Sequence, residues 1–158
     1  MRIVQFILVV ILFSSCHLNV NSPPETVATP AAPAPVDYKE IEAIMTAQTD
    51  EWNKGNVDGF MKGYWNSPEL KFITKRGVTL SYDSMANGYK RNYNTPEKMG
   101  QLTFTNLVYT TLDADNQIVH CSGRWNVSSP TEKPQSGVFS LIFRKIDNQW
   151  KIIIDHTW

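Results

Sequence analysis

The sequence predicts an α+β domain in which helices come first and an antiparallel sheet follows. Between residues 38 and 93, apolar side chains recur at three- and four-residue steps, the spacing of amphipathic helices. After Gly100 the apolar period changes to two, and four long strand candidates follow at residues 101–112, 117–127, 137–146 and 150–158. Helices followed by a meander of strands indicate a helical layer packed on one face of the sheet.

The helical region divides at residues that start or stop helices. The first helix carries one apolar stripe and ends near Gly55, and Asn56 is placed to cap a second, short helix that Pro68 ends. Short extended pieces at residues 70–74 and 78–80 flank Gly77. Ser81 then caps a third helix that runs to Tyr93, and a loop follows. The stripe of the first helix consists of Tyr38, Ile41, Ile44, Met45 and Trp52.

The last two strands carry apolar residues on both faces. Phe139, Leu141 and Phe143 alternate with Val138, Ile142 and Ile146. Strict alternation along the final strand predicts that Trp150, Ile152, Ile154, His156 and Trp158 share one face, with Asp155 on the other. One helical layer covers one face only, so sheet curvature or a partner subunit must cover the second, and we expect a homodimer.

The N-terminus indicates export. Arg2 precedes an apolar run that ends at Phe13, about half the length of a membrane-spanning helix. Phe13-Ser14-Ser15-Cys16 resembles the bacterial lipobox, which implies a signal peptide at residues 1–15 and lipidation of Cys16. An ordinary secretory signal that contains a cysteine is the alternative. Residues 16–36 form a linker rich in Pro, Ala, Ser and Thr, and one domain occupies residues 37–158.

Charge and cysteine content restrict the remaining possibilities. Lys and Arg number 15, as do Asp and Glu, and no basic run interrupts this balance, so nucleic acid is not an expected partner. The membrane is instead contacted through the lipid anchor, which places the protein in a bacterial cell envelope, facing the periplasm or the surface. Cys121 lies in an apolar, alternating segment and is predicted to be buried and inert.

Several short motifs resemble those of a known family. The stretch from Trp52 to Phe60 resembles the helix–break–helix opening of SnoaL-like domains, which belong to the nuclear-transport-factor-2-like (NTF2-like) superfamily that also includes ketosteroid isomerase. Tyr64-Trp65 and the strand after it resemble the next step of that fold, and residues 150–157 resemble the closing strand of an envelope-associated branch.

This resemblance implies a cone, in which a bent antiparallel sheet wraps around the N-terminal helices and a pocket opens at one end, as in cystatin-like folds. Members are commonly homodimers. Catalytic members place an aspartate on an early strand and a tyrosine on the first helix, where this chain has Thr74 or Lys75 and Ala47. Ketosteroid isomerase activity is therefore not expected.

His156 is the residue on which the functional hypotheses divide. An imidazole at the end of an apolar strand face is either a proton shuttle, with His120 as a second candidate, or a core histidine held by one hydrogen bond. Two histidines without a carboxylate at ligand spacing predict no metal, and no motif indicates a cofactor. The expected pocket lining consists of Trp52, Tyr64, Phe72, Tyr89, Trp125, His156 and Trp158.

Three functions remain open from the sequence. The first is binding of a small apolar ligand without turnover, because an aromatic cavity with a few polar groups is the usual small-molecule site. The second is a protein-interaction or dimerisation module. The third is an acid/base enzyme of the isomerase, cyclase or dehydratase type that uses His156.

Overall fold

The computed structural model describes residues 36–130 and 133–158. The predicted signal peptide, the lipidation site at Cys16 and the linker up to residue 35 lie outside these residues. In the part of the chain that the structure describes, no helix is both long and apolar enough to cross a membrane.

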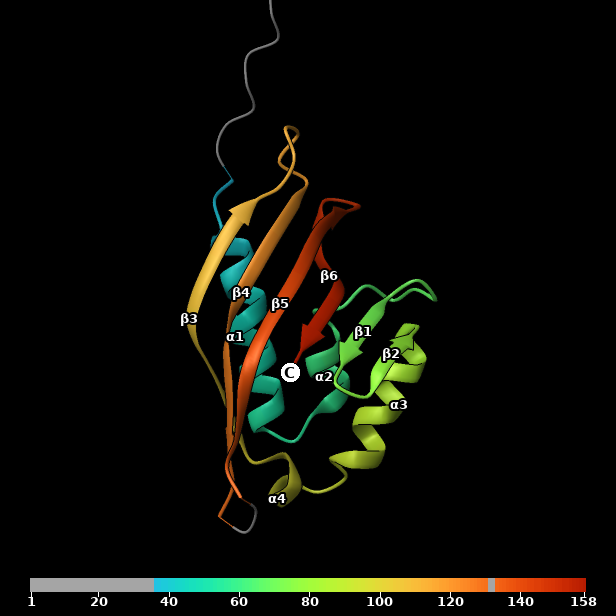
Figure 1. The fold of residues 1–158 in the computed structure, drawn as a ribbon, viewed down its shortest axis with the longest axis vertical. Helices are drawn as coiled ribbons and strands as arrows, with labels where there is room; N and C mark the ends of the chain where they lie inside the picture. Colours follow the sequence, from blue (N-terminus) through green and yellow to red (C-terminus); the bar gives the residue numbers. More distant parts are fainter. Residues whose placement is uncertain (1–35, 131–132) are drawn as a thin grey trace, which may run out of the picture. The chain divides into compact units, whose positions relative to one another are not determined.

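Within the described residues, four helices precede or separate the strands (Figure 1). Helix α1 (Lys39–Asn53) and the short α2 (Val57–Met61) are joined by a break at Gly55, where the backbone adopts a positive φ of 78°. Asn56 caps α2, and Ser81 caps α3 (Tyr82–Asn92), as predicted. The segment predicted as a loop contains one helical turn, α4 (Pro96–Met99), because Thr95 caps it and Pro96 occupies its first position.

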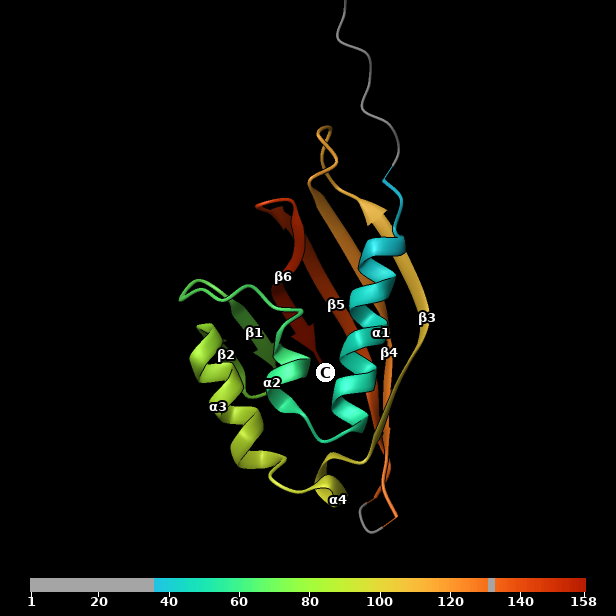
Figure 2. The same ribbon diagram turned by 180° about the vertical axis from the view of Figure 1, so that it is seen from behind.

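The strands form one six-stranded sheet in the order β2-β1-β6-β5-β4-β3. All neighbouring strands are antiparallel except β1 and β6, which run parallel. The predicted curved α+β architecture is confirmed, with α1 lying along one face of the sheet (Figure 2). The strands are β1 (Lys71–Thr74), β2 (Gly77–Leu80), β3 (Gln101–Thr111), β4 (Ile118–Ser128), β5 (Gln135–Ile146) and β6 (Gln149–Thr157).

The hydrophobic core lies between α1 and the inner face of the sheet. Phe143, Ile152 and Val119 from three neighbouring strands are 0% exposed, as is Ile41 from α1. Phe139 and Leu141 point to the same inner face, as the alternation in β5 predicts. The core therefore fixes which face of each strand can contribute to a site.

A β-bulge in β6 changes which residues share that inner face. Ile142 and Phe143 of β5 pair with Ile154 and Ile152, so Ile153 has no partner on β5. At this point β6 also contacts the segment before β1, where Trp65 N–H donates to the Ile152 carbonyl at 2.9 Å. The alternation reverses beyond Ile153, which turns Asp155 inward and Ile154 outward.

Candidate functional site

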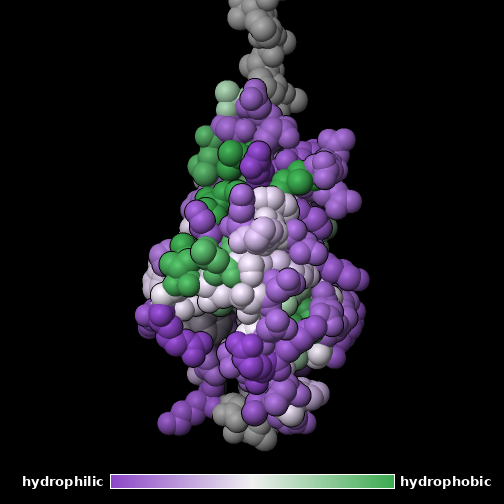
Figure 3. All heavy atoms as spheres, turned by 90° about the vertical axis from the view of Figure 1, so that its right-hand side faces the viewer, coloured by the Kyte–Doolittle hydropathy of each residue, from purple (hydrophilic) through white to green (hydrophobic). Residues whose placement is uncertain are grey.

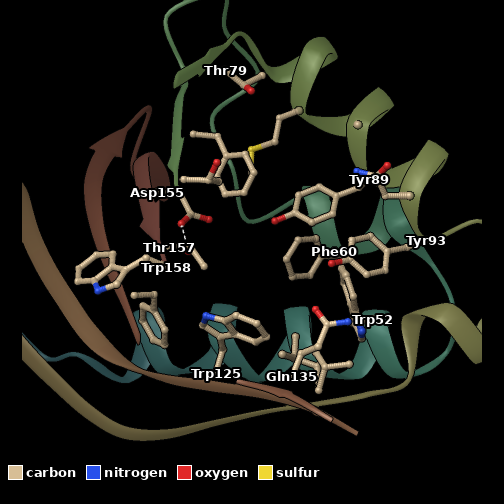
Figure 4. Close-up of a pocket in the computed structure, with 18 of the residues that line it drawn as sticks. Trp52, Phe60, Thr79, Tyr89, Tyr93, Trp125, Gln135, Asp155, Thr157 and Trp158 are labelled. Atoms are coloured by element: carbon tan, nitrogen blue, oxygen red, sulfur yellow. Dashed lines mark hydrogen bonds between the residues drawn. The ribbon is translucent and has the colours of Figure 1, made fainter. Parts of the chain in front are cut away.

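A cavity of about 1190 Å³ lies between the helices and the inner face of the sheet. Pockets that hold drug-sized molecules measure about 300–1,000 Å³, so this one is large enough for such a ligand. Its walls come from α1, α2 and α3, from β1 and β2, and from the inner-face residues of β3 to β6. Figure 4 shows an aromatic side formed by Trp52, Phe60, Tyr89 and Tyr93, and a polar side that includes Asp155 and Thr157.

The aromatic side is a set of edge-to-face contacts centred on Trp52. Its ring centroid lies 5.0 Å from that of Phe60 and 4.9 Å from that of Tyr93, and the ring pairs are T-shaped. The Trp52 indole Nε1 donates a hydrogen bond to the Met99 carbonyl at 2.9 Å, which holds α1 to the end of α4. These contacts fix the rings in place and give the cavity a rigid apolar wall.

Asp155 supplies the polar side with a buried carboxyl group. The residue is 4% exposed, and the Tyr64 hydroxyl donates to its Oδ2 at 2.8 Å. The Thr157 hydroxyl donates to its Oδ1. Burial raises the pKa of Asp155, because the charged form loses its hydration, while the hydrogen bonds from Thr157 and Tyr64 oppose that rise.

The tyrosines around Asp155 are held in their protonated form. Burial and the charge of Asp155 raise the pKa of Tyr64 and of Tyr89 well above the ordinary value. The Tyr64 hydroxyl donates its hydrogen bond to Asp155. Figure 4 shows the Tyr89 side chain directed into the cavity, and a hydrogen bond with Tyr64 opposes part of the rise in its pKa.

Trp125 lines the cavity with its ring and keeps its polar atom buried. Its Nε1 is buried and has no hydrogen-bond partner among the described residues, although the ring lines the cavity. The indole lies over Gly137, its partner in the β4–β5 pair, and a Cβ added at Gly137 would lie 2.7 Å from that nitrogen. Glycine is therefore required for this ring position, and the indole nitrogen is enclosed beside Gly137 rather than exposed to the cavity.

A crystal structure of an NTF-2 like protein of unknown function from Shewanella oneidensis MR-1 is 32% identical to this chain. The alignment covers 75% of this chain and 96% of that one, with a TM-score of 0.70. The chain belongs to the NTF2-like family. The predicted NTF2-like fold is thus confirmed.

Two further solved structures share the NTF2-like architecture at lower identity. An NTF2-like superfamily protein from Salmonella enterica is 18% identical, covers 76% of this chain and 88% of its own, and has a TM-score of 0.60. A protein of unknown function with a cystatin-like fold from Nostoc punctiforme is 12% identical, covers 78% and 91%, and has a TM-score of 0.61. No protein-family model and no curated protein matches the chain.

Most of the residues expected to line the pocket of this NTF2-like domain do line its cavity. They come from α1, α3, β1 and β4, from the segment after α2 and from the residue after β6, so segments far apart in sequence converge. Trp158 lies at the rim and is 44% exposed. The cavity-lining members of the expected set are Trp52, Tyr64, Phe72, Tyr89, Trp125 and Trp158.

His120 and His156 lie elsewhere, on the outer face of the sheet. His156 is exposed and packs against Trp158, with ring centroids 4.3 Å apart. His120 is half-buried, and its Nε2 forms a 2.8 Å hydrogen bond with the Ser140 hydroxyl. The expectation that His156 faces the pocket is wrong, because the bulge at Ile153 reverses the alternation of side chains along β6. His120 and His156 flank Ser140 on β4 and β6, so neither reaches the cavity.

Asp155 is the residue that sequence reasoning assigned to the wrong face. Strict alternation placed it opposite Ile152, and nothing in the composition of β6 marks an extra residue. One signal was present, since a carboxylate directly after three isoleucines is unusual unless the group is paired. Gln48 was also missed; it lies on the cavity side of α1 and its amide donates to the Phe60 carbonyl at 3.2 Å.

Cys121 lies in the core beside Tyr109 rather than in the cavity. The thiol is buried and free, and burial raises its pKa to about 12, so the thiolate is scarce at neutral pH. Within residues 36–130 and 133–158, no group of three or more His, Cys, Asp or Glu side chains could hold a metal ion. The polar groups that line the cavity include the Asp155 carboxyl and the tyrosine hydroxyls.

Replacing Asp155 with asparagine should remove a pH-dependent loss of stability. The raised pKa means that the folded protein binds this proton more tightly than the unfolded chain does. Wild-type stability from this group is therefore greatest below pH 3.8, the ordinary value, and falls as pH rises through the folded pKa. Asparagine keeps the shape and matches the one-donor, one-acceptor pattern of the protonated carboxyl group, so the two proteins should agree within about 1 kcal/mol at low pH.

Urea unfolding followed by circular dichroism between pH 3 and pH 8 measures this difference. The free energy of unfolding of the asparagine variant, relative to that of the wild type, should increase as pH rises and then level off. Glu69→Gln, on the surface before β1, is the matched control and should show no such gain. If the asparagine variant instead becomes less stable than the wild type as pH rises, then the surroundings of Asp155 stabilise its charged form.

Proposed function

We propose that this chain binds a small, largely apolar molecule in the cavity of its NTF2-like domain. The observation that carries this proposal is the open cavity of about 1190 Å³ in a domain whose core is otherwise closely packed. A pure interaction module gains nothing from such a cavity, because unfilled space costs stability. Edge-to-face rings at Trp52 and Phe60 suit a flat or cyclic ligand body.

Isothermal titration calorimetry with 2-naphthamide tests the proposal. This neutral two-ring probe matches the aromatic wall of the cavity. The full chain is used in nanodiscs of zwitterionic lipid, with empty nanodiscs as the blank. We expect saturable binding of one probe per chain.

Gly88→Trp is the variant that should abolish this binding. Gly88 lines the cavity from α3, and a Cβ added there meets only the flexible Arg91 side chain, at 4.0 Å. The new indole therefore enters the cavity without displacing backbone and should weaken binding at least about tenfold. Lys90→Trp adds the same ring to the outer side of α3 and should leave binding unchanged. Equal binding by both variants would place the probe outside the cavity and defeat the proposal.

An acid/base enzyme is the second candidate, now with Asp155 in the role that the sequence suggested for His156. A carboxyl group whose pKa is raised by burial can hold a proton and return it, which isomerases, cyclases and dehydratases require. Tyr64 positions that carboxyl through its 2.8 Å hydrogen bond. Turnover of any cavity ligand that Asp155→Asn abolishes while the fold persists would place this function first.

We also propose that the domain is held at a membrane in the bacterial cell envelope. The support is the sequence pattern from Arg2 to Cys16, followed by a linker with five of the nine prolines. The thioether forms on the cysteine sulfur, so Cys16→Ser should move the protein out of the detergent phase in a partitioning experiment. A variant that partitions like the wild type would exclude the anchor.

A second copy of this chain is the proposed partner, and dimerisation would accompany ligand binding. The outer sheet face carries half-buried Ile142 and Ile154 next to each other, with Val108 58% exposed on the same face. Phe143 is fully buried on the inner face, so Ile142 is the outward position to change. Sedimentation at micromolar concentration tests this proposal. The wild type should sediment as a dimer and Ile142→Lys as a monomer, and a monomeric wild type would contradict the proposal.

A further inference from the structure

The rim of the cavity carries three positively charged side chains from two elements. Lys75 and Arg76 lie in the turn between β1 and β2, and Arg91 lies near the end of α3. All three are exposed. Figure 3 faces the side of the molecule that carries α3 and the β1–β2 hairpin, and most of this surface is hydrophilic.

These charges are not neutralised by neighbouring carboxylates. The ion pairs among the described residues join Lys39 to Asp37, Lys54 to Glu51 and Lys90 to Asp58, and none involves the rim. Asp155 carries the one acidic side chain among the described residues that line the cavity, and it lies buried and bonded to Tyr64. The rim is therefore a region of net positive charge above an uncharged aromatic wall.

Arg76 and Arg91 approach the opening from opposite elements. Arg76 lies close enough to Tyr93, at the end of α3, for its charge to oppose the rise that burial causes in the pKa of that tyrosine. Arg91 is on α3 itself, two residues before Tyr93. Two guanidinium groups near one opening offer several donors in a geometry that suits carboxylate, sulfate or phosphate.

We propose that the ligand of this cavity is an organic anion, with an aromatic or cyclic body inside and its acidic group between Arg76 and Arg91. This inference rests on the proposed function and adds the ligand class. The body contacts the aromatic wall around Trp52. The acidic group stays at the rim, where it is partly hydrated and away from the buried Asp155.

Comparison of 2-naphthoate with 2-naphthamide isolates the acidic group, because the two probes share a body and differ in one charge. Calorimetry on the full chain in zwitterionic nanodiscs should give naphthoate roughly tenfold the affinity of naphthamide at low salt. The preference should shrink in about 1 M salt, where the screening length is about 3 Å.

The double variant Arg76→Gln with Arg91→Gln should bring the two affinities together by weakening naphthoate alone. Arg124→Gln with Arg144→Gln is the matched control, since both arginines are exposed on the outer sheet face and the net charge changes equally. That control should keep the preference. Naphthamide binding with no preference for naphthoate, or an equal loss in the control, would overturn this inference and leave the proposed function standing. Binding of neither probe would overturn both.

Discussion

Replacing Trp52 with alanine should lower the free energy of unfolding by about 3–5 kcal/mol. The side chain is 4% exposed, so its removal leaves a void that the surrounding rings cannot fill without losing their edge-to-face contacts. The loss also leaves the buried Met99 carbonyl without the indole donor that it accepts from at 2.9 Å. The void and the unpaired carbonyl both lower the stability, so this substitution is among the most destabilising.

Trp158→Ala is the matched control, because it makes the same change at the cavity rim. This ring is 44% exposed, and its removal should cost less than about 1 kcal/mol. Urea unfolding followed by far-ultraviolet circular dichroism compares the two without depending on tryptophan fluorescence. Equal costs for the two variants would show that the Trp52 cluster is not part of the structural core.

The helices and long strands were predictable because each has a strong local signal. In α1, Ile41, Met45 and Trp52 recur at helical steps, and all three are buried against the sheet. The caps at Asn56 and Ser81 are equally local, since each side chain accepts a hydrogen bond from an amide three residues later. The single turn of α4 is too short for any periodicity, although Thr95 and Pro96 carried its start signal.

The order of the strands and the shape of the cavity depend on distant pairings instead. The parallel contact of β1 with β6 joins Phe72 to Asp155, and no local pattern records it. The aromatic residues of the cavity were identifiable as a set because apolar rings must be buried somewhere. Sheet curvature decides which rings face the cavity and which pack against each other, and sequence periodicity does not predict this curvature.

The bulge at Ile153 is the point where local reasoning fails and a functional residue changes face. Alternation from Ile152 correctly places every inner residue of β6 up to that point and wrongly places every one beyond it. The pairing that surrounds the bulge comes from two different neighbours, the segment at Trp65 and strand β1. Bulges near sites commonly re-aim a side chain, and here the side chain that is re-aimed is Asp155.

Two single variants, Ile152→Asp and Ile154→Asp, should show whether β6 contains the bulge at Ile153. Ile152 is 0% exposed, so Ile152→Asp buries a charge without a partner and should cost more than about 4 kcal/mol. A domain with a typical stability of about 5–15 kcal/mol loses much of it or unfolds. Ile154 faces outward, half-buried and paired with Lys71 on β1, so Ile154→Asp should cost no more than about 1 kcal/mol.

An unbulged strand predicts the opposite for the second variant, because regular alternation puts Ile152 and Ile154 on the same buried face. Urea unfolding of both variants at submicromolar concentration, where self-association does not add to stability, measures each cost directly. A small cost for Ile154→Asp beside a large one for Ile152→Asp requires the extra residue between them. If both variants unfold, then β6 runs without a bulge, His156 faces the cavity, and Asp155 loses its place in the site.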